Sequence, residues 1–234
     1  MRKNGFEIDE IGKRLVRYYG TRKKLNIPEG IEFLASRCLF NQREIESVSL
    51  PEGVLVVGSY SFHRCKKLSE IHLPDSLEKI GEKAFGNCNI QQLTIPPHTS
   101  HICNSAFEGC PNLESIRIQD GDVDLEIQDY AFADCKSLKS VVLINRITDI
   151  GTAAFSDCTR LEKIFLPDSI TRIARKAFYW CRSLKSVMIP ESVLYIGEQA
   201  FGNCDALTEI HIPRRCIYDP SAFPEGCRVI RMTT

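Results

Sequence analysis

The sequence predicts an α/β solenoid: a right-handed superhelix of about nine coils of ~23 residues, with one parallel sheet face and short helical turns opposite. Three observations predict it. Residues 68–88, 138–158, 161–181 and 184–204 fall on one template, as in LEKIFLPDSITRIARKAFYWC and LKSVMIPESVLYIGEQAFGNC. A phenylalanine recurs at one position of this template, and a cysteine follows it at another. A fixed period of this kind is typical of stacked coils, each of which buries its apolar edge against the next.

The composition limits the classes of function. The 234 residues include 30 basic and 30 acidic ones, so the overall charge does not favour nucleic acid or an anionic membrane as a partner. The start, MRKNGFEIDEIGKR, has no apolar core of signal-peptide length, and no stretch approaches the roughly 18 apolar residues of a membrane span. We expect a soluble chain without membrane insertion, cytoplasmic as the sequence stands.

The chain divides into a cap, an array and a tail. Residues 1–24 lie outside the period and read as two short strands around Gly12 and Lys13, a hairpin that caps the first coil. The array covers residues 25–227, and residues 228–234 form a C-terminal cap or tail. The first coil already has the core pattern, although Arg43 stands at the position of the later cysteines; its pattern is Leu25, Ile27, Pro28, Ile31, Leu34 and Phe40.

Each coil is expected to contain a strand, a turn, an extended segment and a short helix. Residues 71–73 alternate between inward and outward side chains with the period of two that indicates a strand. Pro74 ends this strand, because proline cannot donate a hydrogen bond to a ladder. Residues 75–80 form a second extended segment, and residues 82–88 form one helical turn.

Two columns of side chains are expected in the interior. Nine of the twelve phenylalanines form a buried spine. Seven of the eleven cysteines form a parallel column that we interpret as small buried thiols, with a disulfide ladder and a soft-metal ladder as alternatives. The phenylalanines are Phe40, Phe62, Phe85, Phe107, Phe132, Phe155, Phe178, Phe201 and Phe223; the cysteines are Cys65, Cys88, Cys110, Cys135, Cys158, Cys181 and Cys204.

Two departures from the repeat are candidate metal sites. Asp120, Asp122 and Asp124 alternate in an inserted loop, like the start of a calcium loop, but Leu125 and Ala131 stand where a turn glycine and a ligating glutamate belong. A solvated acidic loop is the alternative. His98, His101 and Cys103 lie close in sequence, but they offer only three ligands, and Cys103 occupies the small-residue position of the repeat.

The repeat Leu-x-x-Ile-x-Leu-Pro-x-x-Ile-x-x-Ile-Gly-x-x-Ala-Phe-x-x-Cys resembles the BspA-like, Treponema-type leucine-rich repeat of bacterial proteins over residues 25–227. The residues from Phe6 to Gly20 also resemble the cap that often precedes such arrays. The resemblance implies a leucine-rich-repeat fold and a surface or secreted protein in adhesion, with a host or cell-surface glycoprotein as one possible partner. It carries no catalytic motif and no cofactor.

Functional residues must lie at positions that the repeat leaves free. Val142, Phe165 and Met188 occupy the outward strand position of three successive coils, so we expect a contiguous apolar stripe. Arg117 and His211 flank the stripe, and we expect them to orient a peptide or a carbohydrate. We therefore predict a partner-binding face of Arg117, Val142, Phe165, Met188 and His211, with a surface that binds no ligand as the alternative.

Other motifs are weaker. Tyr179 and Trp180 are a candidate interface anchor, or they pack over the neighbouring turn. Ser61 and His63 flank a spine phenylalanine, but no acid orients them as a nucleophile and base. No nucleophile elbow, phosphate loop or dinucleotide fingerprint occurs, so we expect no enzyme.

Three hypotheses of function follow. The first is a module that binds a protein, a peptide or a glycan through its sheet face. The second is an intracellular scaffold or self-associating protein, which reduced thiols would suit. The third is a calcium- or metal-dependent binding module that uses the acidic loop or the histidines.

Overall fold

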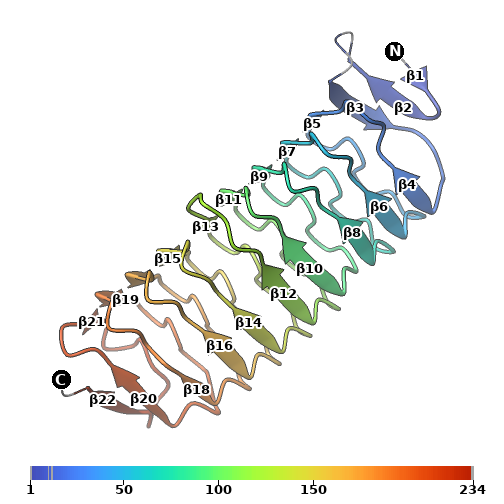
Figure 1. The fold of residues 1–234 in the computed structure, drawn as a ribbon. Coiled ribbons are helices and arrows are strands. Elements are labelled where there is room, and N and C mark those ends of the chain that lie inside the picture. The colour runs from blue at the N-terminus through green and yellow to red at the C-terminus, as the bar shows by residue number, and fades with distance from the viewer. Residues whose placement is uncertain (1, 10, 12, 233–234) are drawn as a thin grey trace.

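The structure is a computed structural model that describes residues 2–9, 11 and 13–232. It shows one elongated stack of about nine coils of ~23 residues, which runs from the N-terminal end to the C-terminal end without a break (Figure 1). Each coil contributes two short strands, and equivalent strands of successive coils lie side by side. The repeat period therefore predicted the architecture correctly.

The first strand of each coil belongs to what we call the front sheet. Its strands pair in parallel and in register, so that Val142 lies beside Phe165. The ladder is interrupted between β8 and β10, and between β18 and β20 it is reduced to a single bridge from Met188 to His211. The strands are β4 (Lys24–Asn26), β6 (Ser47–Ser49), β8 (Glu70–His72), β10 (Gln92–Ile95), β12 (Ser115–Ile118), β14 (Ser140–Val142), β16 (Lys163–Phe165), β18 (Ser186–Val187), β20 (Glu209–Ile212) and β22 (Arg228–Arg231).

The second extended segment of each coil also forms a ladder, so the expectation of a single sheet face is wrong. One or two residues of each segment pair with the next coil, and among the described residues this back sheet has 12 strands, of which the first three come from the N-terminal residues. The strands are β1 (Arg2–Lys3), β2 (Phe6–Ile8), β3 (Arg14–Tyr18), β5 (Phe33–Leu34), β7 (Val56–Val57), β9 (Lys79–Ile80), β11 (His101–Ile102), β13 (Glu126–Ile127), β15 (Asp149–Ile150), β17 (Arg172–Ile173), β19 (Tyr195–Ile196) and β21 (Ile217–Tyr218).

The N-terminal residues extend the back sheet. Strands β2 and β3 are antiparallel, and β3 then pairs in parallel with β5 of the first coil, with Leu15 beside Leu34. Gly12, around which a hairpin was expected, lies outside the described residues. At the other end, β22 pairs in parallel with β20.

The predicted helical turns are also wrong, because the described residues contain no helix. Every turn except the last, around Phe223, has two residues with a left-handed backbone four positions apart, for example Lys83 (φ 49°) and Asn87 (φ 58°). A right-handed helix cannot continue through left-handed residues. The turn is instead a series of tight bends.

These bends distribute their backbone N–H groups in two directions. The amide of Gly86 donates within its own turn to the Lys83 carbonyl (3.2 Å). The amide of Asn87 donates to the next coil, to the Glu108 carbonyl (2.8 Å). A helix would direct its interior amides into its own chain. The alternation instead creates a third ladder of hydrogen bonds between coils, along the turn side of the molecule.

The phenylalanine spine is formed from Phe62 to Phe223. Neighbouring ring centroids lie 5.0–5.8 Å apart with interplanar angles of 4–15°. The prediction that Phe40 is the first member of the spine is wrong. Leu39 fills the first spine position, and Phe40 is 39% exposed. The strand pairing sets this register. Leu34 pairs with Val57, and five residues after each of them the chain has Leu39 and Phe62, so Leu39 is the neighbour of Phe62 in the spine.

The cysteine column consists of buried free thiols, as we predicted, and no disulfide ladder is formed. Each column thiol donates a hydrogen bond to a carbonyl of the preceding coil, as Cys88 does to Phe62 (3.1 Å). The seven Sγ–O distances are 3.1–3.4 Å. Burial raises the pKa of Cys65, Cys110 and Cys204 to about 12, so these thiols stay protonated at neutral pH.

Candidate recognition surface

Three apolar side chains lie exposed in one row of the front sheet. Val142 is 51%, Phe165 58% and Met188 83% exposed. Val142 pairs in register with Phe165, and Ile164 pairs with Val187, which sets Met188 beside Phe165. Parallel strands lie about 4.8 Å apart, so the three side chains form a continuous stripe. We call Val142, Phe165 and Met188 the apolar stripe.

A polar residue stands at each end of the stripe. Arg117 precedes Val142 in the same row, since Ile116 pairs with Val141. His211 follows Met188 through a parallel bridge. His211 Nε2 lies 2.8 Å from a carboxylate oxygen of Glu209, which Arg228 also contacts. These contacts lower the pKa of the Glu209 carboxyl, mainly through the hydrogen bond from Arg228. The row therefore contains all five residues of the predicted face.

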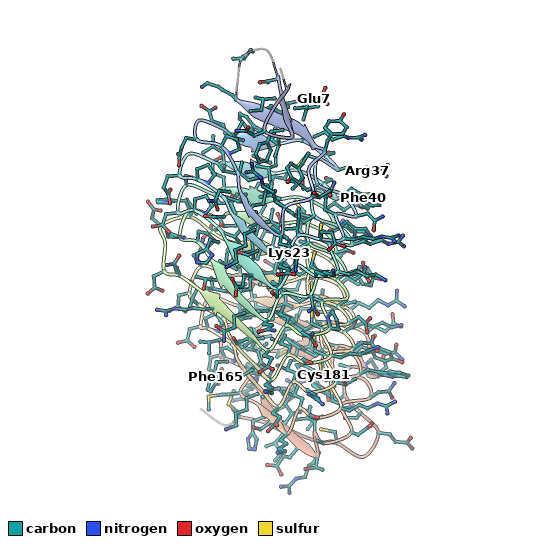
Figure 2. The ribbon with its side chains drawn as sticks, turned by 90° about the vertical axis from the view of Figure 1, so that its right-hand side faces the viewer. Glu7, Lys23, Arg37, Phe40, Phe165 and Cys181 are labelled. Carbon is teal, nitrogen blue, oxygen red and sulfur yellow. The ribbon has the colours of Figure 1, made fainter. Side chains whose placement is uncertain are left out.

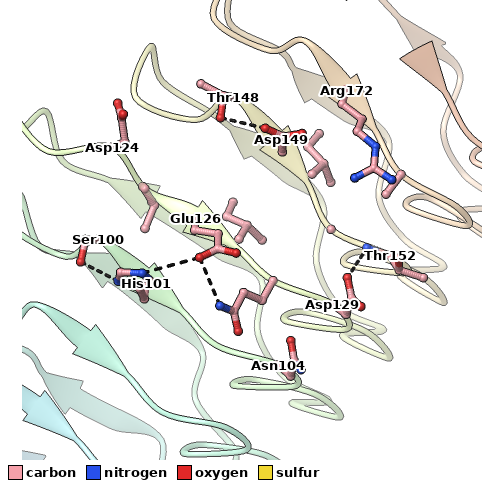
Figure 3. A pocket seen from close by; sticks show the side chains of 16 residues that line it. Ser100, His101, Asn104, Asp124, Glu126, Asp129, Thr148, Asp149, Thr152 and Arg172 are labelled. Carbon is pink, nitrogen blue, oxygen red and sulfur yellow. Dashed lines mark hydrogen bonds and ion pairs between the residues drawn. The ribbon is translucent and has the colours of Figure 1, made fainter.

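A polar hollow of about 740 Å³ lies on the back sheet (Figure 3). Glu126 and Asp149 line it from adjacent strands, with His101 on one side and Arg172 on the other. His101 Nε2 lies 3.6 Å from Glu126, and the Thr148 hydroxyl donates to Asp149 (2.9 Å). No sequence motif pointed to this hollow, because its residues come together only when the second extended segments of successive coils pair as strands.

The acidic loop covers a buried arginine. The guanidinium of Arg146 donates to the carbonyls of Thr99 (2.8 Å) and Pro96 (2.9 Å), two coils away. Burial lowers the pKa of Arg146, and the nearby carboxylates of Asp120 and Asp122 partly offset this effect. The loop and the arginine therefore hold neighbouring coils together, a role that neither the acidic motif nor Arg146 indicates in the sequence.

Neither candidate metal site is formed. In the described part of the chain, no three His, Cys, Asp or Glu side chains are placed to hold a metal ion. The ring of His98 contacts the Asp75 carbonyl (3.0 Å), whereas His101 contacts Ser100 and Glu126. Cys103 is buried at the small-residue position.

Two other candidate pairs have structural partners. The Ser61 hydroxyl donates to the backbone carbonyls of Gly58 and Ala35, and the His63 ring stacks on Phe40 at 5.8 Å. Tyr179 packs over Gly202, where an added Cβ would lie 3.0 Å from its ring.

Trp180 remains 37% exposed on the turn side of the stack. The guanidinium of Arg182 lies 4.7 Å from its ring centroid, a cation–π contact.

Comparison with known proteins decides the family. The family model described as "BspA type Leucine rich repeat region (6 copies)" matches residues 33–125 and 125–232. The chain belongs to the BspA-type leucine-rich repeat family. None of the curated proteins matches this BspA-type chain. Within the described residues the chain forms no helix with the length and apolarity needed to cross a membrane.

Solved bacterial structures resemble this BspA-type chain over most of its length. The leucine-rich repeat protein TpLRR of T. pallidum is 26% identical, with a TM-score of 0.59, over 88% of this chain and 89% of that one. A leucine-rich cell surface protein from Faecalibacterium prausnitzii A2-165 is 20% identical, with a TM-score of 0.51, over 100% and 95%. A leucine-rich repeat protein from Bacteroides ovatus is 19% identical, with a TM-score of 0.51, over 94% and 88%. At the lower identities the likeness shows the fold alone.

Proposed function

We propose that the chain is a non-enzymatic binding module that recognises a protein or peptide partner through the front sheet. The observation that carries the proposal is the apolar stripe, whose three members are all more than half exposed. Contiguous apolar side chains with a polar rim are typical of a partner surface. Arg117 and His211, at the two ends, would orient the partner.

The site of action is part of the proposal. One similar structure is that of a leucine-rich cell surface protein. We extend this role to the present chain and propose adhesion, with a host or cell-surface glycoprotein as the partner. The division into an N-terminal cap, residues 1–24, an array, residues 25–227, and a tail, residues 228–234, also remains a proposal.

Substitution of Phe165 by Glu tests the proposal. The charge would disrupt an apolar interface, whereas the exposed ring contributes little to the fold. We expect the free energy of unfolding to change by less than about 1 kcal/mol, as is usual for surface positions. Binding to purified matrix glycoproteins and to bacterial envelope fractions, measured by biolayer interferometry, should be lost.

Leu194→Glu is the matched control. Leu194 is 57% exposed, like Phe165, but it lies beside the back sheet. It should retain full binding. Equal binding by wild type and Phe165→Glu would refute the proposed face, and marked unfolding of Phe165→Glu would show that the ring belongs to the core. Concentration-dependent dimers that only Phe165→Glu abolishes would assign the stripe to self-association.

A further inference from the structure

A second surface lies at the N-terminal end, on the turn side of the molecule, well separated from the stripe (Figure 2). Because Leu39 fills the spine position, the ring of Phe40 points outward and stacks on His63. The guanidinium of Arg37 lies 5.9 Å from the centroid of Phe40 and 5.3 Å from that of Tyr60. Because Leu39 and not Phe40 occupies the spine, the rings of Phe40, His63 and Tyr60 and the guanidinium of Arg37 form one wall at the surface.

This wall borders a hollow of about 450 Å³ between β3 and the first turn. The hydrogen bond from the Tyr18 amide to the Cys38 carbonyl (2.9 Å) holds β3 against the turn. Glycine at position 20 leaves room for the buried Tyr18 side chain beside the hollow, since a Cβ there would lie 2.2 Å from the Tyr18 hydroxyl. Tyr19 is 49% exposed on the β3 side of the hollow. We call this hollow the cap groove.

The cap groove is electrostatically suited to an anion. Residues 13–24 contain six lysines and arginines and no aspartate or glutamate, and of the six only Lys13 and Lys23 form ion pairs within the described residues, with Glu32 and Glu46. Arg17 and Arg37 line the groove, and neither forms an ion pair with a carboxylate in the described part of the chain. Glu7 lies across from Arg17 on β2, but its carboxylate accepts the hydroxyl of Tyr19. The guanidinium groups are therefore available to an incoming carboxylate.

The side chains indicate which kind of anion fits. A guanidinium binds a carboxylate through two parallel hydrogen bonds. The adjacent rings of Phe40 and Tyr19 offer apolar area, and tyrosine and arginine are the residues that most often anchor a protein partner. A concave site with both features suits a chain that alternates acidic and bulky apolar side chains.

We propose that the cap groove binds a short acidic peptide segment of a partner protein. A carboxylate of the peptide pairs with Arg17 and Arg37, and a neighbouring aromatic or aliphatic side chain packs on Phe40 and Tyr19. This site is independent of the apolar stripe, so one chain can hold two partner segments at once.

Fluorescence anisotropy with a labelled peptide of alternating glutamate and phenylalanine tests the proposal on the full chain. The double substitution Arg17→Gln and Arg37→Gln should raise the Kd of the peptide by roughly ten- to a hundredfold, because hydrogen bonds between charged groups are lost. Arg172→Gln removes an exposed arginine of the back sheet and should leave the Kd unchanged. Phe165→Glu should also bind normally, which separates this site from the proposed function.

Two control peptides and one competitor complete the test. Replacing glutamate by lysine should abolish binding, and replacing phenylalanine by alanine should weaken it at least fivefold. Equal binding of either control peptide would overturn the proposal, as would equal weakening by Arg172→Gln. Anionic phosphatidylserine vesicles should not displace the peptide; displacement at matched charge would assign the surface to membranes instead. Melting curves of all variants confirm that each is folded.

Discussion

At the scale of single residues, the most informative side chain is Arg146. Arg146 stands at a repeat position that holds glycine or serine in most other coils, and backbone carbonyls of two other segments surround its guanidinium. The acidic residues of the neighbouring loop compensate the charge from outside. An insertion that looks like a calcium loop in sequence is thus explained by an arginine 20 or so positions later, as expected for stacked coils in which distant residues become neighbours.

Arg146→Ala should be strongly destabilising. It leaves the carbonyl of Thr99 buried without its donor, and such orphaned groups cost about 1–3 kcal/mol each. The carbonyl of Pro96 loses its donor as well, so we expect a total loss of roughly 2–6 kcal/mol, measured by guanidinium unfolding.

The control for this prediction is Arg172→Ala, which removes an exposed arginine and should cost less than about 0.5 kcal/mol. Equal costs for the two variants would show that the buried contacts of Arg146 contribute nothing specific.

At the scale of the coil, the thiol column contributes a dependence of stability on pH. Burial raises the pKa of each column thiol, to about 12 for Cys65 and Cys110, against an ordinary value near 8.5. The folded state therefore retains protons that the unfolded state releases. The contribution is fully present below about pH 8.5 and falls as the pH rises toward 12.

We accordingly predict a steep alkaline loss of stability. Between pH 9 and 10, each buried thiol should remove up to about 1.4 kcal/mol per pH unit from the free energy of unfolding. Urea titrations from pH 7 to 10 measure the slope. Cys110→Ala should reduce the slope of the free energy of unfolding against pH by the contribution of one thiol, although it also lowers stability at pH 7. A slope that Cys110→Ala leaves unchanged would contradict this account.

The coil also shows what sequence can and cannot predict. Period, spine and thiol column follow from residue type, because only apolar side chains recur at those positions. The turn conformation cannot be predicted from residue type in this way. Asparagine at position 87 favours a left-handed backbone, but lysine at position 83 does not. Leu39 and Phe40 are both apolar, so composition cannot choose between them, and only the pairing of β5 with β7 does. The apolar stripe could be predicted because the repeat frame places its three residues at the same strand position. The back-sheet hollow could not, because it depends on the pairing of strands that are only two residues long.

At the scale of the whole molecule, stability depends on contacts between neighbouring coils. Phe132 stacks between Phe107 and Phe155 at 5.3 and 5.4 Å in the middle of the stack. Phe132→Ala should cost about 3–5 kcal/mol, as is usual for buried phenylalanine. Hydrogen exchange should accelerate on both sides of the altered coil.

Phe165→Ala makes the same chemical change on the surface, where the ring is 58% exposed. It should cost less than about 1 kcal/mol and leave exchange in the neighbouring coils unchanged. A comparable cost for both variants would mean that the stacked rings do not join the coils energetically.

The left-handed turn residues also have a mechanical consequence. Hydrogen bonds along the front, the back and the turns all point from one coil to the next, roughly parallel to the direction in which the stack grows. A force that separates the two ends therefore loads all three sides of a coil together, and none of them can stretch alone as a helix would. Such a body should resist extension like a short rod and then come apart one coil at a time.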